Sequence, residues 1–367
     1  MKISAIKIYK VPLTSHKTYY MGDGKACATL DTIVVKIETD AGIGGFGEVC
    51  PIPHYLPAYA EGVVPAIEEL APLLIGADPM GVERVMGKVD HWLKGHGYAK
   101  SPLDIALWDL NARALGVPVY QLLGGAYTKS VPTYHSITCV EPDDMARIAK
   151  DVQTDGIEQF QVKLGADDDW QADAERLIRV REAVGPGPLV YGDWNCSATK
   201  LDATRVGRAV SHLDIMLEQP CETIEECGAV RHATGLPMKL DECVSGIDQI
   251  MKANALECMD VVTLKIAKFG GLTPTKKGRD LLMHFGVKVC AECMWGSDII
   301  TAASVHLAAA TPPRYLQNVC DLSGYVAPRL APDGPVRQGG RIQVSDAPGL
   351  GVTPDEDTLG APIAHLN

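Results

Sequence analysis

Eight short apolar segments recur between residues 133 and 320, at intervals of about 26 residues. The segment VVTLKI at 261–266 has the apolar run of a strand that is buried on both faces, as in parallel sheets. Amphipathic segments lie between the strands and end at glycines such as Gly156 and Gly185, as helices do. This count and rhythm predict an α/β fold with a (β/α)8 TIM-like barrel. The expected strands are residues 133–138, 160–165, 189–194, 215–220, 237–242, 261–266, 287–292 and 315–320.

The residues before the barrel follow a different pattern. Two strand candidates, AIKIYKVPL and TIVVKIETD, precede helical segments at 62–74, 81–93 and 101–115, the last with Ser101 as N-cap and Pro102 at the first helical position. The end of the chain, GRIQVSDAPGLGVTP, returns as a strand and loop without a helix. We therefore expect three parts: an α+β capping domain (1–125), the catalytic barrel (126–322) and a C-terminal segment that returns to the cap (323–367).

A glycine-rich turn, TDAGIGGFGE, has Gly42, Gly44 and Gly47 in GxGxxG spacing. A dinucleotide site requires a helix after these glycines to hold the pyrophosphate. The following residues, VCPIPHYLPAY, contain three prolines and no helical period. The sequence therefore predicts a hairpin turn at these glycines and no dinucleotide-binding site.

Charge and cysteine content exclude several classes of partner. The formal net charge of −12 argues against nucleic acid or an anionic membrane as a partner. No run approaches the ~18 apolar residues of a membrane span, and the lysine-containing start does not resemble a secretory signal. Eleven scattered cysteines suit a reduced, cytoplasmic protein. Cys290 and Cys293 have CxxC spacing without a second pair, so we expect packing thiols.

Carboxylates stand at the ends of three successive barrel strands. The third expected strand ends at Asp193, the fourth at Glu218 and the fifth at Asp241. Functional residues of such barrels lie at the carboxyl ends of strands, so these side chains should converge. Three like charges repel each other unless a cation joins them, and an all-oxygen set favours Mg²⁺. The sequence predicts one Mg²⁺ per site.

Two lysines complete this set. Lys163 ends the second strand and Lys265 ends the sixth, so the two should face each other across the barrel. A bound substrate carboxylate would present its α-carbon between the two amines. The metal and the opposing ammonium should lower the pKa of one lysine from about 10.4, so that it acts as a base. Loss of the α-proton would give an enediolate that Mg²⁺ stabilises.

Each of these residues has a plainer reading when taken alone. A carboxylate at a strand end often caps a helix or supports another residue, and a lone lysine at Lys163 can extend its amine to solvent. The joint occurrence of five such residues at successive strand ends favours the catalytic reading.

At these residues the chain resembles the enolase superfamily, specifically its muconate-lactonising-enzyme subgroup, over nearly its whole length. The passage from Asp104 to Gly125 is similar to the end of that family's capping domain, and DWN, EQP, LDE and LKIAKFGGL match its ligand and lysine strands in order. The resemblance implies Asp193, Glu218 and Asp241 as metal ligands and Lys163 and Lys265 as catalytic residues. It also implies a cap built from the N-terminal domain and the C-terminal tail.

Two positions depart from the family pattern. The second strand commonly carries KxK in the family, but here Gln161 replaces the first lysine and supplies no positive charge near Lys163. Cys243 replaces the serine of a DES motif, which we expect to be neutral. No His–Asp pair stands at the sixth and seventh strand ends, which argues against the mandelate-racemase branch.

The subgroup racemises, dehydrates or cycloisomerises through the same intermediate. The passage NVCDLSGYVAP is similar to that of members acting on proline-type amino acids, cis-3-hydroxyproline dehydratases in particular. We therefore expect dehydration of cis-3-hydroxy-L-proline, a small carboxylate substrate, by a homo-oligomer. The alternatives are a racemase or 2-epimerase of proline-type amino acids or betaines, a dipeptide epimerase, and an inactive metal-binding scaffold. Retention of both lysines argues against the scaffold.

Four further residues are candidate substrate contacts. Asp321 can pair with a secondary ammonium, or it is a loop residue bonded to backbone. Glu292, at the seventh strand end, is a second candidate for the ammonium or for a lysine. Trp295 and Tyr55 can supply aromatic faces. Tyr55 lies in one of two cap loops, residues 15–25 and 51–59, that we expect to close over the substrate.

Overall fold

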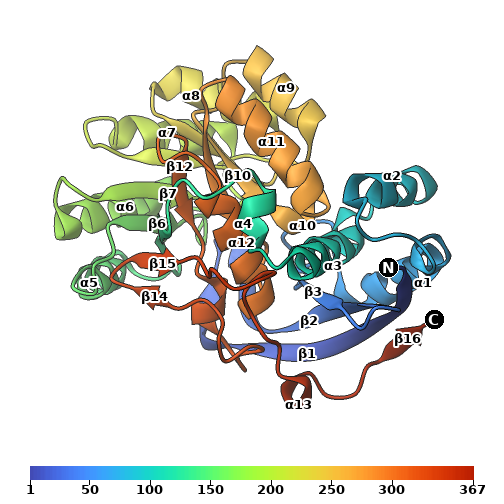
Figure 1. Cartoon of the computed structure of the whole chain (residues 1–367). Coiled ribbons are helices and arrows are strands. Elements are labelled where there is room, and N and C mark those ends of the chain that lie inside the picture. The colour runs from blue at the N-terminus through green and yellow to red at the C-terminus, as the bar shows by residue number, and fades with distance from the viewer.

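A computed structural model describes all residues of the chain, 1–367. Its largest sheet has eight parallel strands that lie side by side in chain order (Figure 1). A parallel bridge between Thr133 and Val319 joins the two edges of this sheet. The predicted barrel is thereby confirmed. Its strands are β5 (His135–Ile137), β6 (Gln159–Lys163), β7 (Leu189–Asp193), β8 (Met216–Glu218), β9 (Met238–Leu240), β10 (Val261–Lys265), β11 (Lys288–Glu292) and β12 (Leu316–Val319).

Helices follow the first seven of these strands and cover the outside of the barrel (Figure 1). Polar N-cap residues mark the start of several of these helices. The Asp169 side chain accepts a hydrogen bond from the Gln171 backbone, and Thr223 forms a reciprocal capping box with Glu226. The helices are α5 (Pro142–Gln153), α6 (Trp170–Val184), α7 (Lys200–Ala209), α8 (Ile224–Thr234), α9 (Ile247–Ala255), α10 (Ile266–Phe269), α11 (Leu272–His284) and α12 (Asp298–Ala309).

The N-terminal residues form an antiparallel sheet backed by helices, as the sequence predicted. Strands β2 and β3 form the expected hairpin around Gly42, with Val35 opposite Gly47. The elements are β1 (Ile3–Tyr20), β2 (Ala26–Thr39), β3 (Gly44–Val49), α1 (Val63–Leu74), α2 (Val82–Trp92), α3 (Gly97–Leu115), α4 (Val119–Leu122), β4 (Ser130–Pro132) and the 3-10 turns Gly22–Gly24 and Ala60–Gly62.

Helix α3 begins earlier than the sequence predicted. Its N-cap is His96, in a left-handed conformation, and Pro102 lies inside the helix instead of at its first position. A Cβ on Gly97 would lie 3.3 Å from the Lys268 carbonyl oxygen and 3.4 Å from the Gly270 Cα. This close packing against α10 stabilises an additional helical turn before Ser101, which the N-cap pattern in the sequence did not predict.

The C-terminal residues return to two earlier parts of the chain. Strands β13 (Val326–Ala327) and β16 (Ala364–Leu366) pair with β1, whereas β15 (Arg341–Gln343) pairs with β4 and with β14 (Arg337–Gln338). The 3-10 helix η3 (Leu322–Tyr325) and the short helix α13 (Glu356–Leu359) complete the chain. The expected strand and loop without a helix are confirmed for residues 340–354, since α13 begins only after them. Buried Asp298 of α12 anchors the segment because its carboxylate accepts hydrogen bonds from the backbones of Leu330 and Ala331.

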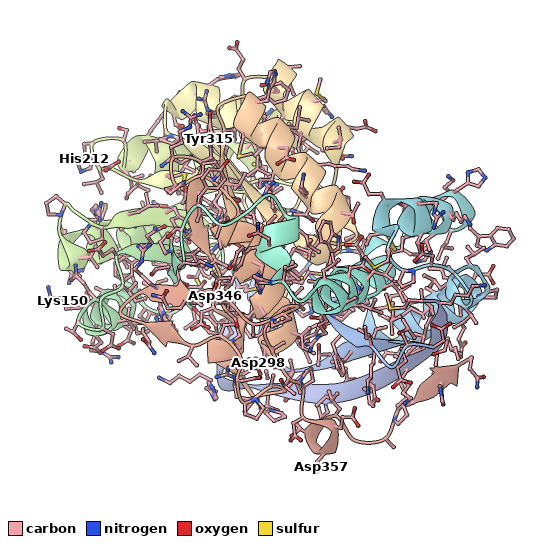
Figure 2. The ribbon with its side chains drawn as sticks, in the orientation of Figure 1. Lys150, His212, Asp298, Tyr315, Asp346 and Asp357 are labelled. Carbon is pink, nitrogen blue, oxygen red and sulfur yellow. The ribbon has the colours of Figure 1, made fainter.

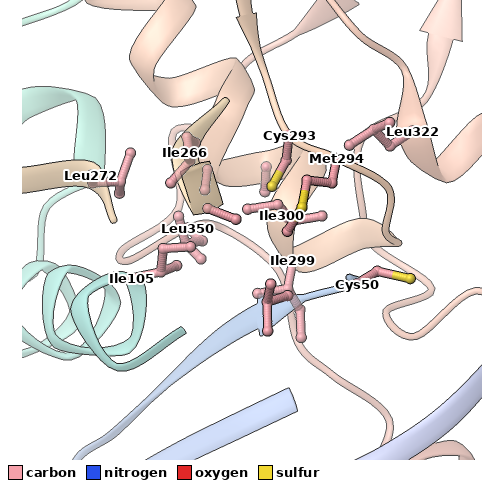
Figure 3. Packing of buried hydrophobic residues seen from close by; sticks show 14 of the residues in the cluster. Cys50, Ile105, Ile266, Leu272, Cys293, Met294, Ile299, Ile300, Leu322 and Leu350 are labelled. Carbon is pink, nitrogen blue, oxygen red and sulfur yellow. The ribbon is translucent and has the colours of Figure 1, made fainter. Parts of the chain in front are cut away.

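One hydrophobic core joins the N-terminal layer to the barrel. Figure 3 shows Cys50, next to β3, and Ile105 of α3 close to Ile266, Ile299 and Ile300 of the barrel helices. Charged side chains such as Lys150 and Asp357 project outward, as Figure 2 shows. None of the helices combines the length and apolar character needed to cross a membrane. The shared core fixes how the N-terminal layer lies over the barrel.

Gly47 tests the packing of β3 on α3. A Cβ at Gly47 would lie 1.9 Å from the Pro102 carbonyl oxygen and 2.9 Å from the Ala106 nitrogen, both backbone atoms. Gly47→Ala is expected to lower the free energy of unfolding by at least about 2 kcal/mol. Gly87→Ala is the control, because its Cβ meets nothing within 4 Å on helix α2, and it should stabilise by up to about 1 kcal/mol. Urea unfolding measures the free energy of unfolding of both variants, and equal changes would refute the close contact between Gly47 and α3.

Asp104 predicts a pH-dependent contribution to stability. Its Oδ1 accepts a hydrogen bond from the Thr273 backbone, but its Oδ2 has no partner, and burial raises its pKa to about 7. The folded protein therefore keeps a proton that the unfolded chain releases near pH 4, so this stability is complete below pH 4 and is lost as the pH rises through 7.

Relative to Asp104→Asn, the wild-type protein should lose up to about 4 kcal/mol of unfolding free energy between pH 4 and pH 8. Urea unfolding at several pH values measures the difference between the two proteins. Parallel stability profiles would show that Asp104 does not titrate differently in the folded protein.

Candidate active site

The five predicted strand-end residues gather at one end of the barrel. Lys163, Asp193 and Glu218 end β6, β7 and β8 and are neighbours in register. Asp241 directly follows β9, and Lys265 ends β10 beside Glu292 of β11. All six are at least 94% buried. The barrel thus brings ammonium and carboxylate groups together out of contact with water.

Lys163 contacts the first carboxylate. Its Nζ forms an ion pair with Asp193 and donates a 2.8 Å hydrogen bond to the Asn195 side-chain oxygen. The Asn195 backbone N–H in turn donates to Asp193 Oδ1 at 2.9 Å. Asn195 therefore holds both the acid and the lysine in place.

Asp241 lies among three donors. Lys265 donates to its Oδ2, Tyr55 donates to the same oxygen at 3.0 Å, and Lys268 donates to Oδ1 at 2.9 Å. Burial alone would raise the pKa of Asp241, but the two ammonium groups hold it well below its usual range. Asp241 is therefore ionised throughout the physiological pH range.

Glu218 is held from below, inside the barrel. Gln161 donates to its Oε2 at 2.7 Å, Thr263 donates to its Oε1 at 3.3 Å, and the Lys239 Nζ lies 2.9 Å from Oε1. Burial raises the pKa of Glu218, Lys239 opposes this, and the neighbouring Asp193 and Asp241 reinforce it. The charges of the two aspartates thus make ionisation of Glu218 costly.

Neighbouring carboxylates raise the pKa values of both lysines. Burial and the opposing Lys265 both lower the pKa of Lys163, but Asp193 and Glu218 outweigh them and raise it. Burial likewise opposes the charge of Lys265, and Asp241 and Glu292 raise its pKa well above the ordinary value. Each ammonium thus pairs with carboxylates, and the lowering of one lysine's pKa by a bound metal stays a prediction.

The donor set fits a hard divalent cation in its chemistry. Asp193, Glu218 and Asp241 are buried, lie on adjacent strands and supply only oxygen, the ligand type that Mg²⁺ prefers. They do not form a ready-made cluster of three ligands, since each carboxylate contacts a lysine. Their mutual repulsion is nevertheless the kind that a cation relieves.

A small cavity of about 50 Å³ joins both lysines. Lys163, Lys265 and Glu292 line it together with Tyr55 and Trp295. Most of the remaining wall is apolar, from Met21, Cys27, Ile52, Met294, Cys320 and Leu322. Within it, Tyr134 donates to both Glu292 oxygens at 3.3 Å, whereas the Trp295 indole N–H is buried without a partner. The inner cavity therefore presents two ammonium groups to a compact molecule, and the Trp295 indole in its wall has an unpaired donor.

A larger outer cavity of about 360 Å³ adjoins the inner one. The two share Tyr19, Tyr134, Ser136, Trp295 and Tyr325 in their walls. The rings of Tyr19, Trp295 and Tyr325 lie 5.9 to 6.3 Å apart, centroid to centroid. These three aromatic side chains stand between the inner and outer cavities.

Asp321 is the one predicted contact that lies apart from the lysines. It lines the outer cavity and not the inner one, and its Oδ2 is 3.6 Å from Arg337 Nε. Burial raises the pKa of Asp321, and Arg337 partly opposes this. Tyr55, Glu292 and Trp295 do line the inner cavity. The turns around η3 set the direction in which the Asp321 side chain points, and the strand pattern in the sequence did not indicate that direction.

Sequence reasoning missed Tyr134, Lys239 and Lys268, whereas Tyr19 belongs to the segment 15–25 that was expected to close over the substrate. Lys239 carried a usable signal, because it is a lysine in an apolar strand two residues before Asp241 and so on the same face. Tyr134 carried none, because aromatic residues in strands are as common in ordinary cores.

Comparison with family models gives two matches that together span most of the chain. Residues 8–124 match the mandelate racemase/muconate lactonizing enzyme N-terminal domain. Residues 144–358 match the enolase C-terminal domain-like family.

Individual relatives match over the full length. The chain is 41% identical to the cis-3-hydroxy-L-proline dehydratase of Roseibium aggregatum, with all of both chains covered. It is 31% identical to the N-succinyl-L-Arg/Lys racemase of Bacillus cereus, with 98% of this chain and 97% of that one covered. A crystal structure of a mandelate racemase/muconate lactonizing enzyme from Roseovarius nubinhibens ISM, complexed with magnesium, superposes over 100% of both chains with a TM-score of 0.95 and 32% identity.

Lys268 tests the support of Asp241. Lys268→Met removes the ammonium that faces Oδ1 while Lys265 still pairs with Oδ2, so unfolding free energy should fall by about 1.5–3 kcal/mol. Lys276→Met is the control, because its 2.9 Å pair with Asp280 is partly exposed and should matter by less than about 1 kcal/mol. Urea unfolding compares the two, and similar losses would refute the role of Lys268.

Proposed function

Because the chain belongs to the mandelate racemase/muconate lactonizing enzyme family of the enolase superfamily, whose members include dehydratases, racemases and epimerases, we propose that it dehydrates cis-3-hydroxy-L-proline with Mg²⁺ as cofactor. The single observation that carries the proposal is the inner cavity, where Lys163 and Lys265 face the same small space beside three buried carboxylates. Full-length similarity to a dehydratase named for this substrate supports the choice of reaction.

We propose Asp193, Glu218 and Asp241 as the residues that hold the metal. Bound Mg²⁺ would supply positive charge to stabilise the negative charge that develops on the substrate carboxylate when the α-proton leaves. The magnesium complex of the Roseovarius nubinhibens relative supports this cofactor. Ammonium groups now balance the same carboxylates, so a divalent cation would relieve Lys163 and Lys265 of that role.

The two lysines supply the proton transfers. One takes the α-proton onto its neutral amine, and the other, as an ammonium, donates a proton to the departing hydroxyl, which leaves as water. In cis-3-hydroxyproline the hydroxyl is cis to the carboxylate and therefore lies on the ring face opposite the α-hydrogen. Amines on opposite sides of the substrate suit this geometry, and the enamine product tautomerises to a cyclic imine.

The walls of the inner cavity support a compact substrate. The small size and mostly apolar lining of this cavity favour a compact ring over a dipeptide. We propose Glu292 as the partner of the ring ammonium, since it lies in the inner cavity, and Tyr55 and Trp295 as further contacts. Asp321 would act only on a substrate that extends into the outer cavity.

One observation favours a second candidate. The outer cavity offers about 360 Å³ beside the inner one, which is room for an N-acyl group or a second amino acid. The 31% identical relative is named as a racemase of N-succinyl amino acids. Epimerisation of such a substrate would use the same lysines without a leaving group.

Deuterium exchange separates the two reactions. We expect the Mg²⁺-loaded protein in D₂O to convert cis-3-hydroxy-L-proline to the cyclic imine, and ¹H NMR measures this conversion. The panel also contains 4-hydroxyproline, proline betaine, dipeptides and N-succinyl amino acids. Inversion with α-deuterium on a substrate without a β-hydroxyl would make the enzyme an epimerase instead.

Variants tie any observed reaction to the two lysines. Lys163→Ala and Lys265→Ala should each slow turnover by at least about 100-fold, and the double variant should exchange no α-proton. Lys276→Met, outside both cavities, should retain activity. Exchange that survives in the double variant would refute the mechanism.

A further inference from the structure

Lys239 is a fully buried lysine inside the barrel that none of the proposed steps uses. It lies on β9, is 0% exposed, and pairs in register with Glu218 of β8. Because side chains alternate along a strand, Lys239 points to the same side as Asp241, one layer deeper. A lysine in such a place is costly unless its charge has a partner.

The surroundings of Lys239 show what its charge faces. Its Nζ lies 2.9 Å from Glu218 Oε1 and 4.0 Å from Glu292 Oε1. It makes no aligned hydrogen bond, and instead lies over the rings of Tyr191 at 4.6 Å and Tyr134 at 5.5 Å. The contact is therefore chiefly one of charge with charge and with π-faces.

Lys239 is the only cation that pairs with Glu218. Asp193 pairs with Lys163, and Asp241 pairs with Lys265 and Lys268, but no other lysine or arginine lies within 4.0 Å of Glu218. The remaining donors to Glu218, Gln161 and Thr263, are neutral. The neutral Gln161 and the charged Lys239 thus contact different oxygens of the Glu218 carboxylate.

We propose that Lys239 is the resident cation of Glu218: it positions and neutralises this carboxylate in the metal-free protein and thereby limits how strongly the site attracts a divalent cation. The inference rests on the proposed metal site at Asp193, Glu218 and Asp241. Lys239 acts through Glu218 and is a positioning residue.

Thermodynamic linkage gives the direction of the effect. Without Lys239, Glu218 is buried with only neutral donors, so the metal-free protein loses stability. A divalent cation on the same carboxylate would replace part of the missing charge, so the metal-bound protein loses less. Removal of Lys239 should therefore weaken the metal-free fold and tighten metal binding.

The test compares Lys239→Met with wild type at pH 8.5, by thermal unfolding with and without MgCl₂ and by calorimetric titration with Mg²⁺. We expect a lower melting temperature without Mg²⁺, a larger rise on adding Mg²⁺, and a Kd for Mg²⁺ about tenfold lower. Lys100→Met is the control, because Lys100 of α3 is also buried and pairs at 2.8 Å with Asp90 of α2, away from the metal site. It should leave the Mg²⁺ response unchanged.

A relocated charge gives the second test. Gln161 Nε2 lies 2.7 Å from Glu218 Oε2, so Gln161→Lys in the Lys239→Met background returns an ammonium to the other oxygen of the same carboxylate. We expect the Kd for Mg²⁺ to return toward the wild-type value. If Lys239→Met is insoluble, Lys239→Gln and the double variant carry the same comparison.

The outcomes separate this inference from the proposed function. If Mg²⁺ binds neither the wild type nor the variants, the proposed metal site is refuted. If wild type binds Mg²⁺ and Lys239→Met binds it equally or more weakly, the metal site stands and the role of Lys239 is refuted. A failure of the relocated lysine to reverse a tightened Kd would also overturn the electrostatic account.

Discussion

Buried charge at the strand ends is the constraint on which the rest of this structure depends. Parallel strands of a barrel bring their carboxyl ends together, so Asp193, Glu218 and Asp241 cannot avoid one another once the barrel closes. Their repulsion, with little water to screen it, is costly unless cations lie beside them. The chain supplies those cations on neighbouring strands, with Lys163 beside Asp193 and Lys265 beside Asp241.

The N-terminal layer turns this charged barrel end into an enclosed site. Tyr19 of β1 and Tyr55 of the loop after β3 reach into the inner cavity, and Tyr55 contacts both Asp241 and Lys265. The continuous core between α3, α12 and the strands keeps this layer in register with the barrel (Figure 3). Exclusion of water strengthens every charge interaction beneath it, which is what removal of a weakly acidic α-proton requires.

A layer of polar residues beneath the strand ends shapes the site as much as the strand ends do. Gln161, Thr263 and Lys239 each stand two residues before a strand-end group, and all three converge on Glu218. The positive charge that Gln161 does not provide on β6 is present on β9. Electrostatic balance in a barrel interior is a property of the whole ring of strands, because a charge on one strand can compensate a change on another.

The sequence by itself determined the barrel, the family and the order of charged residues at the strand ends, because apolar periodicity and short motifs are local properties of the chain. Even so, Pro102 misplaced the start of α3, since packing of Gly97 on α10 outweighed the local cap. Only the tertiary structure decided which charges meet: that Lys268 supports Asp241, that Lys239 faces Glu218, and that Asp321 turns toward Arg337 and away from the lysines. Those pairings join residues distant in the chain, and their energies depend on burial and separation, which exist only once the barrel has closed.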